Sequence, residues 1–402
     1  MRSDECGQKM PGLSAQLWAC SLPAGGGSQR CGLECLSTMD TLIGMSTPSD
    51  LERVESRIIE LVRNHLSVPA TDIAESCRPV LHEVVEQAVT SSEGGKRLRA
   101  RLAIAAFDAI RPHAGPETRD AMVDLACAIE VFQTAALVHD DIIDESDLRR
   151  GKPSAHRALA EATHSTAIGR GLGLMLGDIL ATMSIAIAEH AASCLHHPHA
   201  LDSAFLHMQR DVSVGQVLDL AVELNPLDNP TQLADASLNV FRWKTASYTT
   251  MAPLQLGLTA AGIDPDRAAE LAERIGRPVG VAFQLADDLL DVIGYTKATG
   301  KPVGGDIKEG KRSVLLADAL TLSDAPARDE LIAMYEAPQR DAQDVRRGIE
   351  IFTGCGAVDR SRERISALWN EARTAIASSG LDHDAQQTLI KACRMFIPDS
   401  CL

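Results

Sequence analysis

The 402-residue sequence has few aromatic side chains, because Phe, Trp and Tyr together make up only 3% of it. Strands favour aromatic and β-branched residues, and much of the apolar content here is Ala and Leu, so the composition favours helices. Long uncharged apolar runs are also missing. Even the most apolar stretch, residues 171–192, contains Asp178 and Glu189. No membrane span is therefore expected.

Positive charge is scarce relative to negative charge. The 39 Lys and Arg residues against 55 Asp and Glu residues give a formal net charge of −16. Such a surface repels phosphate backbones, which excludes a general nucleic-acid binder. The ten cysteines contain no CxxC pair. Scattered thiols in a chain of this length indicate a reducing compartment, and we expect a cytoplasmic location.

The first 48 residues differ from the rest of the chain. They are rich in Gly, Ser and Cys and show no helical period, which is typical of a flexible extension. The segment 50–53 has the composition of a capped helix start. We therefore divide the chain into an N-terminal extension, 1–48, and a folded domain, 49–402. The functional start is Met1, Met39 or Met45.

Apolar residues recur with the period of a helix. In residues 118–144, which contain neither Gly nor Pro, Leu125, Ile129, Phe132 and Ala136 are spaced by 4, 3 and 4. Comparable runs occur near 201–224, 266–292 and 359–380. No alternation of strands and helices is visible. The sequence predicts one large all-α bundle of about ten helices.

Two acidic clusters have the same DDxxD spacing, each at the end of a long apolar run. Their carboxylates are Asp140, Asp141, Asp144, Asp287, Asp288 and Asp291. On a helix the first and last Asp of a cluster share a face, and such groups repel one another unless a cation joins them. Oxygen-only ligands suit Mg²⁺, with Mn²⁺ as the alternative. We expect two or three ions per active site, around a diphosphate.

Basic residues accompany both acidic clusters. They lie in segments 94–99, 148–152 and 310–313 and at Lys301. In an acidic chain, Arg and Lys beside acidic motifs indicate anion capture, since both bind phosphates readily.

These motifs together resemble those of the trans-isoprenyl diphosphate synthases, or polyprenyl synthetases. The matching segments, in family order, are GGKRLR at 94–99, FQTAALVHDDIIDESDLRRGKP at 132–153, GQVLD at 215–219, KTAS at 244–247, FQLADDLLD at 283–291 and GK at 300–301. The resemblance implies an all-α bundle of the isoprenoid synthase type with a central active-site cavity, usually as a homodimer. It implies a transferase that joins an allylic diphosphate (dimethylallyl, geranyl or farnesyl) to isopentenyl diphosphate.

The same resemblance implies roles for individual residues. The six aspartates become the metal site, with Asp140, Asp144 and Asp287 as leading ligands. Cations for the allylic diphosphate are Arg149, Lys244 and Lys301. The isopentenyl diphosphate site comprises Lys96, Arg99, Gln133 and Arg150. Polar groups that border the reacting carbons are Thr245, Gln284 and Gln216, so the catalytic set is Lys244, Thr245, Gln284 and Lys301.

Small residues below the first acidic cluster bear on product length. Ala135 and Ala136 precede Asp140 by five and four residues, about 6–7.5 Å along a helix. An aromatic there would block a growing chain in this family, and the next bulky side chain is Phe132. We expect all-trans geranylgeranyl diphosphate (C20) as main product, with a farnesyl or a longer-chain synthase as the alternative.

Other functions remain open. A terpene cyclase also carries DDxxD, but its second metal motif is usually NSE-like and it lacks the isopentenyl-binding cations. A non-catalytic synthase subunit usually loses one acidic motif, and both are intact here. A phosphohydrolase using His139 and Asp140 would need further paired His ligands at helical sites.

Overall fold

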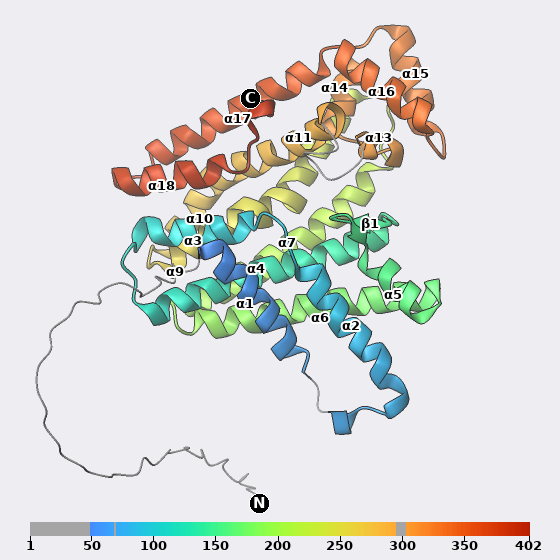
Figure 1. Ribbon diagram of the computed structural model, residues 1–402. Helices are drawn as coiled ribbons and strands as arrows, with labels where there is room; N and C mark the ends of the chain where they lie inside the picture. Colours follow the sequence, from blue (N-terminus) through green and yellow to red (C-terminus); the bar gives the residue numbers. More distant parts are fainter. Residues whose placement is uncertain (1–48, 68–69, 295–302) are drawn as a thin grey trace, which may run out of the picture. The chain divides into compact units, whose positions relative to one another are not determined.

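The computed structural model describes residues 49–67, 70–294 and 303–402, and helices make up most of these residues (Figure 1). The first helices are α1 (Asp50–His65), α2 (Arg78–Ser92), α3 (Leu98–Ile110), α4 (Pro116–Ile143), α5 (Ala155–Thr163), α6 (Thr166–Ala192), α7 (Pro198–Val222), α8 (Pro230–Val240) and α9 (Ala252–Ala260). They are followed by α10 (Pro265–Leu271), α11 (Arg277–Ile293), α13 (Gly305–Glu309), α14 (Val314–Leu322), α15 (Ala325–Glu336), α16 (Ala342–Gly354), α17 (Ala357–Ala377) and α18 (His383–Arg394). Short 3-10 turns occupy Ala70–Asp72, Glu75–Cys77 and Asp399–Cys401.

The strands of the described residues are limited to one short hairpin. Strands β1 (Leu148–Arg149) and β2 (Lys152–Pro153) pair antiparallel, with Leu148 opposite Pro153. The predicted all-α class is therefore confirmed. The described chain holds more helical segments than the ten expected, because short helices flank the turns.

Two segments adopt the wider π-helical turn, Phe241–Met251 and Ala272–Gly276. The second divides the apolar run predicted at 266–292 into α10 and α11. The first carries the KTAS motif and continues α8 into α9 without a loop. Such π segments often mark functional sites.

The start of α1 is the one that its residues predict. Ser49 Oγ accepts a hydrogen bond from Glu52 N at 3.3 Å, and Ser49 N donates to Glu52 Oε2 at 2.7 Å. This reciprocal pair is a capping box, which satisfies two backbone donors at the helix end. The apolar face of α1 then buries Val54, Ile58 and Val62.

Helix α4 is the central element for the site. Its 28 residues span about 42 Å at about 1.5 Å per residue, and most of its side chains are buried. It packs along α6, which in turn packs against α7 (Figure 1). At Gly177 on α6, an added Cβ would stand 2.2 Å from His139 Nε2 of α4. Glycine thus allows α6 to approach the end of α4 closely.

Two apolar cores support the described bundle. One gathers α1, α3, α4, α6, α7 and α9 around residues such as Phe107, Leu125 and Phe205. The other gathers α8, α11, α14 and α17 around residues such as Leu285 and Ile365. The π segment Phe241–Met251 contacts both α7 and α11, so its side chains reach the region between the two acidic motifs.

Two described helices, α4 and α6, have the length and apolar composition that crossing a membrane would need. In the apolar window of α4, 78% of the residues are buried inside the protein, against 44% in α6. Core helices of soluble proteins meet the same criterion, so the expected absence of a membrane span stays a prediction.

Candidate active site

The first acidic motif lies at the C-terminal end of α4, where Asp144 forms the C-cap. Lys244 on the π segment reaches Asp140, with Nζ 3.0 Å from Asp140 Oδ1, and also Asp219 of α7, 2.6 Å from Oδ2. Burial alone would raise the pKa of Asp140, but Lys244 and Arg149 outweigh burial and hold that pKa below its usual value. Burial and the neighbouring charge of Asp140 raise the pKa of Asp144 to about 6.

Glycine brings Lys244 into place. Gly215 of the GQVLD segment faces the backbone of the π segment, and a Cβ there would stand 2.2 Å from Lys244 N. Because the two backbones approach this closely, Asp219, four residues after Gly215, lies within reach of Lys244 Nζ.

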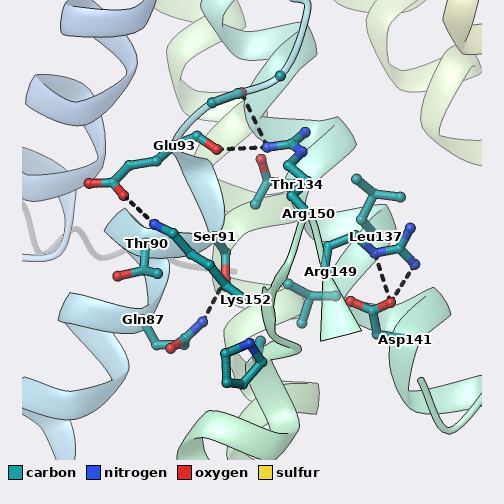
Figure 2. A pocket seen from close by; sticks show the side chains of 15 residues that line it. Gln87, Thr90, Ser91, Glu93, Thr134, Leu137, Asp141, Arg149, Arg150 and Lys152 are labelled. Atoms are coloured by element: carbon teal, nitrogen blue, oxygen red, sulfur yellow. Dashed lines mark hydrogen bonds and ion pairs between the residues drawn. The ribbon is translucent and has the colours of Figure 1, made fainter. Parts of the chain in front are cut away.

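The hairpin that follows α4 brings cations to the acidic end of the helix. Arg149 Nε donates to Asp141 Oδ1 at 2.9 Å, and its Nη2 contacts the same oxygen (Figure 2). Burial raises the pKa of Asp141, and the contact with Arg149 counters that rise only in part. The Asp141 carboxylate is therefore already engaged by the chain itself.

The second acidic motif belongs to a hydrogen-bonded chain. Thr245 Oγ1 donates to Gln284 Oε1 at 2.8 Å, and Gln284 Nε2 donates to Asp288 Oδ1 at 2.8 Å. Asp288 is 8% exposed, and its Oδ2 has no hydrogen-bond partner among the described residues. Burial, reinforced by the charge of Asp306, raises its pKa well above the usual value.

Asp291 holds the segment that follows α11. Its two carboxylate oxygens each accept a backbone hydrogen bond at 3.0 Å, from Gly305 and from Asp306. Burial and the nearby Asp306 raise the pKa of Asp291 to about 6. The carboxylate thus caps α13 and positions the residues after it.

A cavity of about 760 Å³ joins the hairpin to this segment. Its lining includes Arg149 and Arg150 on one side and Asp291, Asp306 and Lys311 on the other. Burial would lower the pKa of Lys311, but Asp306 and Glu309, followed by Asp144 and Asp140, hold it above its usual value. Lys311 is therefore charged and lies within the fields of both acidic motifs.

The sequence patterns assigned no role to Asp219 or Asp306, and Lys311 stood only within a basic segment. The signal for Asp219 was its place as the last residue of the GQVLD motif. Asp306 and Lys311 carried no spacing signal, because their position depends on how the chain turns after α11.

The proposed isopentenyl diphosphate residues gather around the start of α3. Lys96 is exposed, whereas Arg99 is buried, stacks on the Tyr248 ring at 4.1 Å and donates to Thr249 Oγ1 at 2.7 Å. Arg150 Nη1 donates to the backbone oxygens of Glu93 and Gly94, at 2.8 and 3.2 Å, just before this loop (Figure 2).

Gln133 is half-buried on α4. It lies three residues, less than one turn, after Glu130, whose side chain contacts the start of α3. Lys301, to which a role was also assigned, lies outside the described residues.

A buried ion pair that the motifs did not indicate supports the same loop. Arg97 and Glu130 are each 1% exposed at the side chain, with Nη1 3.6 Å from Oε2. Glu130 Oε1 accepts a hydrogen bond from Ala100 N at 3.0 Å. It thereby satisfies a backbone donor in the first turn of α3, which has no side-chain cap of its own. Arg97 holds the left-handed φ of 48° between Lys96 and Arg99.

A cavity of about 540 Å³ extends from Asp140 between α4, α6 and α7. On α4 it is lined by the three residues proposed to set chain length, Phe132, Ala135 and Ala136. Gln216 lines its α7 side near Asp140, and most of the remaining lining is apolar. The edge of the Phe132 ring meets the Tyr248 ring at a centroid distance of 6.2 Å.

The carboxylates suit a hard divalent cation. Among residues 49–67, 70–294 and 303–402, no three His, Cys, Asp or Glu side chains converge closely enough to ligate an ion as they stand. The donors are nevertheless all oxygen, Asp288 keeps an unpartnered buried oxygen, and Asp144 is held close to another negative charge. An added cation would relieve this repulsion, so the residues fit a Mg²⁺ site.

Comparison with known proteins shows which family the chain belongs to. The sequence profile of the Polyprenyl synthetase family matches residues 78–352. The chain is 28% identical over 336 residues to the short chain isoprenyl diphosphate synthase of Methanothermobacter thermautotrophicus, covering 80% of this chain and 96% of that protein. It is 31% identical over 287 residues to the octaprenyl diphosphate synthase of Escherichia coli, covering 71% and 80%.

A solved structure resembles the fold over most of its length. It is the geranylgeranyl pyrophosphate synthase of Corynebacterium glutamicum complexed with isoprenyl diphosphate and magnesium, with a TM-score of 0.73 and 29% identity. The match covers 87% of this chain and 99% of that one. The chain therefore belongs to the polyprenyl synthetase family and is a trans-prenyltransferase.

Proposed function

We propose that this enzyme condenses allylic diphosphates with isopentenyl diphosphate and releases mainly all-trans geranylgeranyl diphosphate. The observation that carries the chain length is the cavity below Asp140, whose α4 wall beyond His139 consists of Ala135 and Ala136 as far as Phe132. Phe132 lies eight residues before Asp140, about 12 Å along the helix. This depth admits a chain longer than an aromatic at Ala135 or Ala136 would allow.

Mg²⁺ would be held by Asp140, Asp144 and Asp287, two or three ions per site, with Mn²⁺ as a substitute. Asp141 and Asp291 support these ligands, since Arg149 and backbone amides already occupy their oxygens. When bound, the metal neutralises charge on the diphosphate leaving group.

Cations of the chain complete the diphosphate site. Lys244 and Arg149 lie at the first acidic motif, and Lys311 lies in the fields of both motifs. As the allylic C–O bond breaks, both electrons leave with the diphosphate, and these fixed charges stabilise the developing anion. Lys301 is assigned to the same task.

The apolar cavity protects the allylic cation from water. Thr245 donates its hydroxyl hydrogen to Gln284. The lone pairs of its oxygen therefore remain available beside the reacting carbons. The π electrons of isopentenyl diphosphate form the new carbon–carbon bond, which lengthens the chain by five carbons. Loss of a proton, which the released diphosphate can accept, restores an allylic product.

Isopentenyl diphosphate would bind at the start of α3, where Lys96 precedes the helix, Arg99 lies in its first turn and Arg150 contacts the backbone of Gly94. Gln133 would donate a further hydrogen bond from α4. The buried Arg97–Glu130 pair keeps this loop in position.

One assay tests the proposal. Purified protein is incubated with Mg²⁺, radiolabelled isopentenyl diphosphate and dimethylallyl, geranyl or farnesyl diphosphate in turn, and the dephosphorylated products are separated by length. We expect C20 as the main product. A dominant C15 product, or products well beyond C20, would overturn the chain length. Products formed without isopentenyl diphosphate would indicate a terpene cyclase, and absence of any turnover would indicate a non-catalytic subunit.

We also propose a cytoplasmic homodimer. Apolar side chains that are 40–53% exposed lie on α6 and α7; among them are Ile168, Met175, Leu206 and Val214. Exposed apolar patches of this kind mark protein contacts. Light scattering on the purified protein should give twice the chain mass, whereas a monomer at micromolar concentration would contradict the dimer.

We propose residues 49–402 as the catalytic domain, a range that contains the whole family match. Residues 1–48 precede this range, and the functional start stays Met1, Met39 or Met45. Intact mass of natively expressed protein tests this, since a mass that begins at Met1 would refute a later start.

A further inference from the structure

The cavity that starts at Asp140 ends at a polar side chain. Its last lining residues, counted away from the acidic motif, are Phe132 on α4, Ala181 on α6 and Gln209 on α7. Gln209 lies seven residues, about 10 Å, from Gln216, which flanks the acidic end. Phe132 lies at a comparable depth on α4. This end of the cavity thus combines one ring and one amide.

The amide of Gln209 is held across the end of the cavity. Its Nε2 donates to Ser184 Oγ of α6 at 3.0 Å, and Ser184 Oγ donates in turn to Ala181 O at 2.6 Å. Because the serine proton goes to the carbonyl, Ser184 must accept from Gln209, which fixes the amide as the donor. Ser184 is fully buried, so this hydrogen bond joins α6 to α7 inside the protein.

We propose that Gln209, held by Ser184, is the floor of the elongation cavity and stops the growing isoprenoid chain. This inference rests on the prenyltransferase function proposed above. A fifth isoprene unit would have to displace the Gln209 side chain and leave Ser184 without its donor. Burying an unpaired polar group beside hydrocarbon is unfavourable, whereas apolar walls would accept the extra carbons. Ser184 acts as a positioning residue, since it affects the growing isoprenoid only through Gln209.

The first test replaces Gln209 in the full-length enzyme and measures product length with dimethylallyl diphosphate as primer, from which both shorter and longer products than C20 can form. Gln209→Ala should raise the ratio of products longer than C20 to the C20 product by about tenfold, as expected for removing one hydrogen-bonded polar side chain that blocks the cavity. Gln209→Phe should shift the distribution toward shorter chains. Gln343→Ala, on the exposed surface of α16, is the matched control and should leave the distribution unchanged.

The second test distinguishes a residue that ends the cavity from one whose loss only loosens the packing of α6 against α7. Ser184→Ala should lengthen products by itself, but less than Gln209→Ala, because the unheld amide still occupies space. Added to Gln209→Ala, it should change the distribution no further. If the contact between Gln209 and Ser184 served only stability, these substitutions would lower the melting temperature without lengthening the products in this way.

The outcomes distinguish failure of the Gln209 assignment from failure of the proposed prenyltransferase function. If the wild type forms no condensation product, the proposed function fails. If the wild type is active and folded, and if active Gln209→Ala and Gln209→Phe enzymes retain its product length, then another residue forms the floor of the cavity. Should Gln209→Ala not fold, Gln209→Phe and Ser184→Ala decide the matter by the same measurement.

Discussion

Lys244 Nζ lies 3.0 Å from Asp140 Oδ1, although 104 residues separate the two along the chain. The same ammonium lies 2.6 Å from Asp219 Oδ2. Three helical segments, α4, α7 and the π segment, thus meet at one charged group. The contact places a permanent positive charge beside the first acidic motif, where the leaving diphosphate would develop its charge.

Replacing Lys244 should therefore impair the chemical step. Lys244→Met should lower kcat by about 10²–10³-fold, the usual result of removing one preorganised group that stabilises a developing anion. The KM for isopentenyl diphosphate should change little, because that substrate is assigned to other cations. Steady-state kinetics measures both, with the exposed Lys391→Met as control. A kcat within about threefold of the wild type would argue against a catalytic role.

Filling the cavity beside Asp140 should shorten the product. Ala135→Phe places a ring about five residues, or 7.5 Å, below the first carboxylate, where it blocks the space seen in the structure. Chromatography of the dephosphorylated products should show C15 replacing the longer chains. Ala135→Ser, which adds little volume, should keep the wild-type length. An unchanged length in an active Ala135→Phe enzyme would remove this cavity from consideration as the elongation path.

Breaking the buried ion pair should destabilise the protein. Glu130→Ala leaves the Arg97 charge without its buried partner and Ala100 N without its acceptor. Loss of one member of a buried pair costs about 3–5 kcal/mol in free energy of unfolding. Urea denaturation measures this loss. Glu117→Ala, exposed on the same helix, should change the free energy by no more than about 0.5 kcal/mol.

The same pair should affect substrate binding selectively. Glu130→Gln keeps an oxygen for Ala100 N but removes the charge, so the start of α3 loses part of its support. The KM for isopentenyl diphosphate should rise while the KM for the allylic substrate stays near the wild-type value. Equal changes in both would show that the pair acts on the fold as a whole.

The raised pKa of Asp144 predicts a pH dependence in metal-free protein. In the folded state this carboxyl keeps its proton up to about pH 6, whereas its ordinary pKa is 3.8. Between these values the folded state binds more protons than the unfolded state, so the free energy of unfolding should fall as pH rises from about 4 to about 6. Asp144→Asn should flatten this slope.

Mg²⁺ should reverse the effect, because it binds the deprotonated carboxylates. The rise in melting temperature on adding Mg²⁺ should be larger at pH 7 than at pH 5. Asp384→Asn, on the exposed surface of α18, is the control that should keep the wild-type slope. A wild-type free energy that rises across pH 4–6 would contradict the assignment to Asp144.

The sequence by itself determined the all-α class, the beginning of α1 near residue 50, the extent of α4 and the family. These features depend on short-range patterns: a 3.6-residue period, a cap three residues from its partner, and aspartates within one helical turn. The space beside Ala135 and Ala136 could also be predicted from the sequence, because both residues lie on the helix that carries Asp140.

Only the tertiary structure decided which distant groups meet. Lys311 and Asp306 lie near the acidic motifs, and Glu130 contacts the start of α3. Gln209 contacts Ser184. In each case the partners belong to different segments of the chain. The division of the run 266–292 by a π turn was equally unforeseen. Such contacts depend on how close two backbones can approach, as at Gly177 and Gly215, and this is set by packing over the whole bundle rather than by local residue spacing.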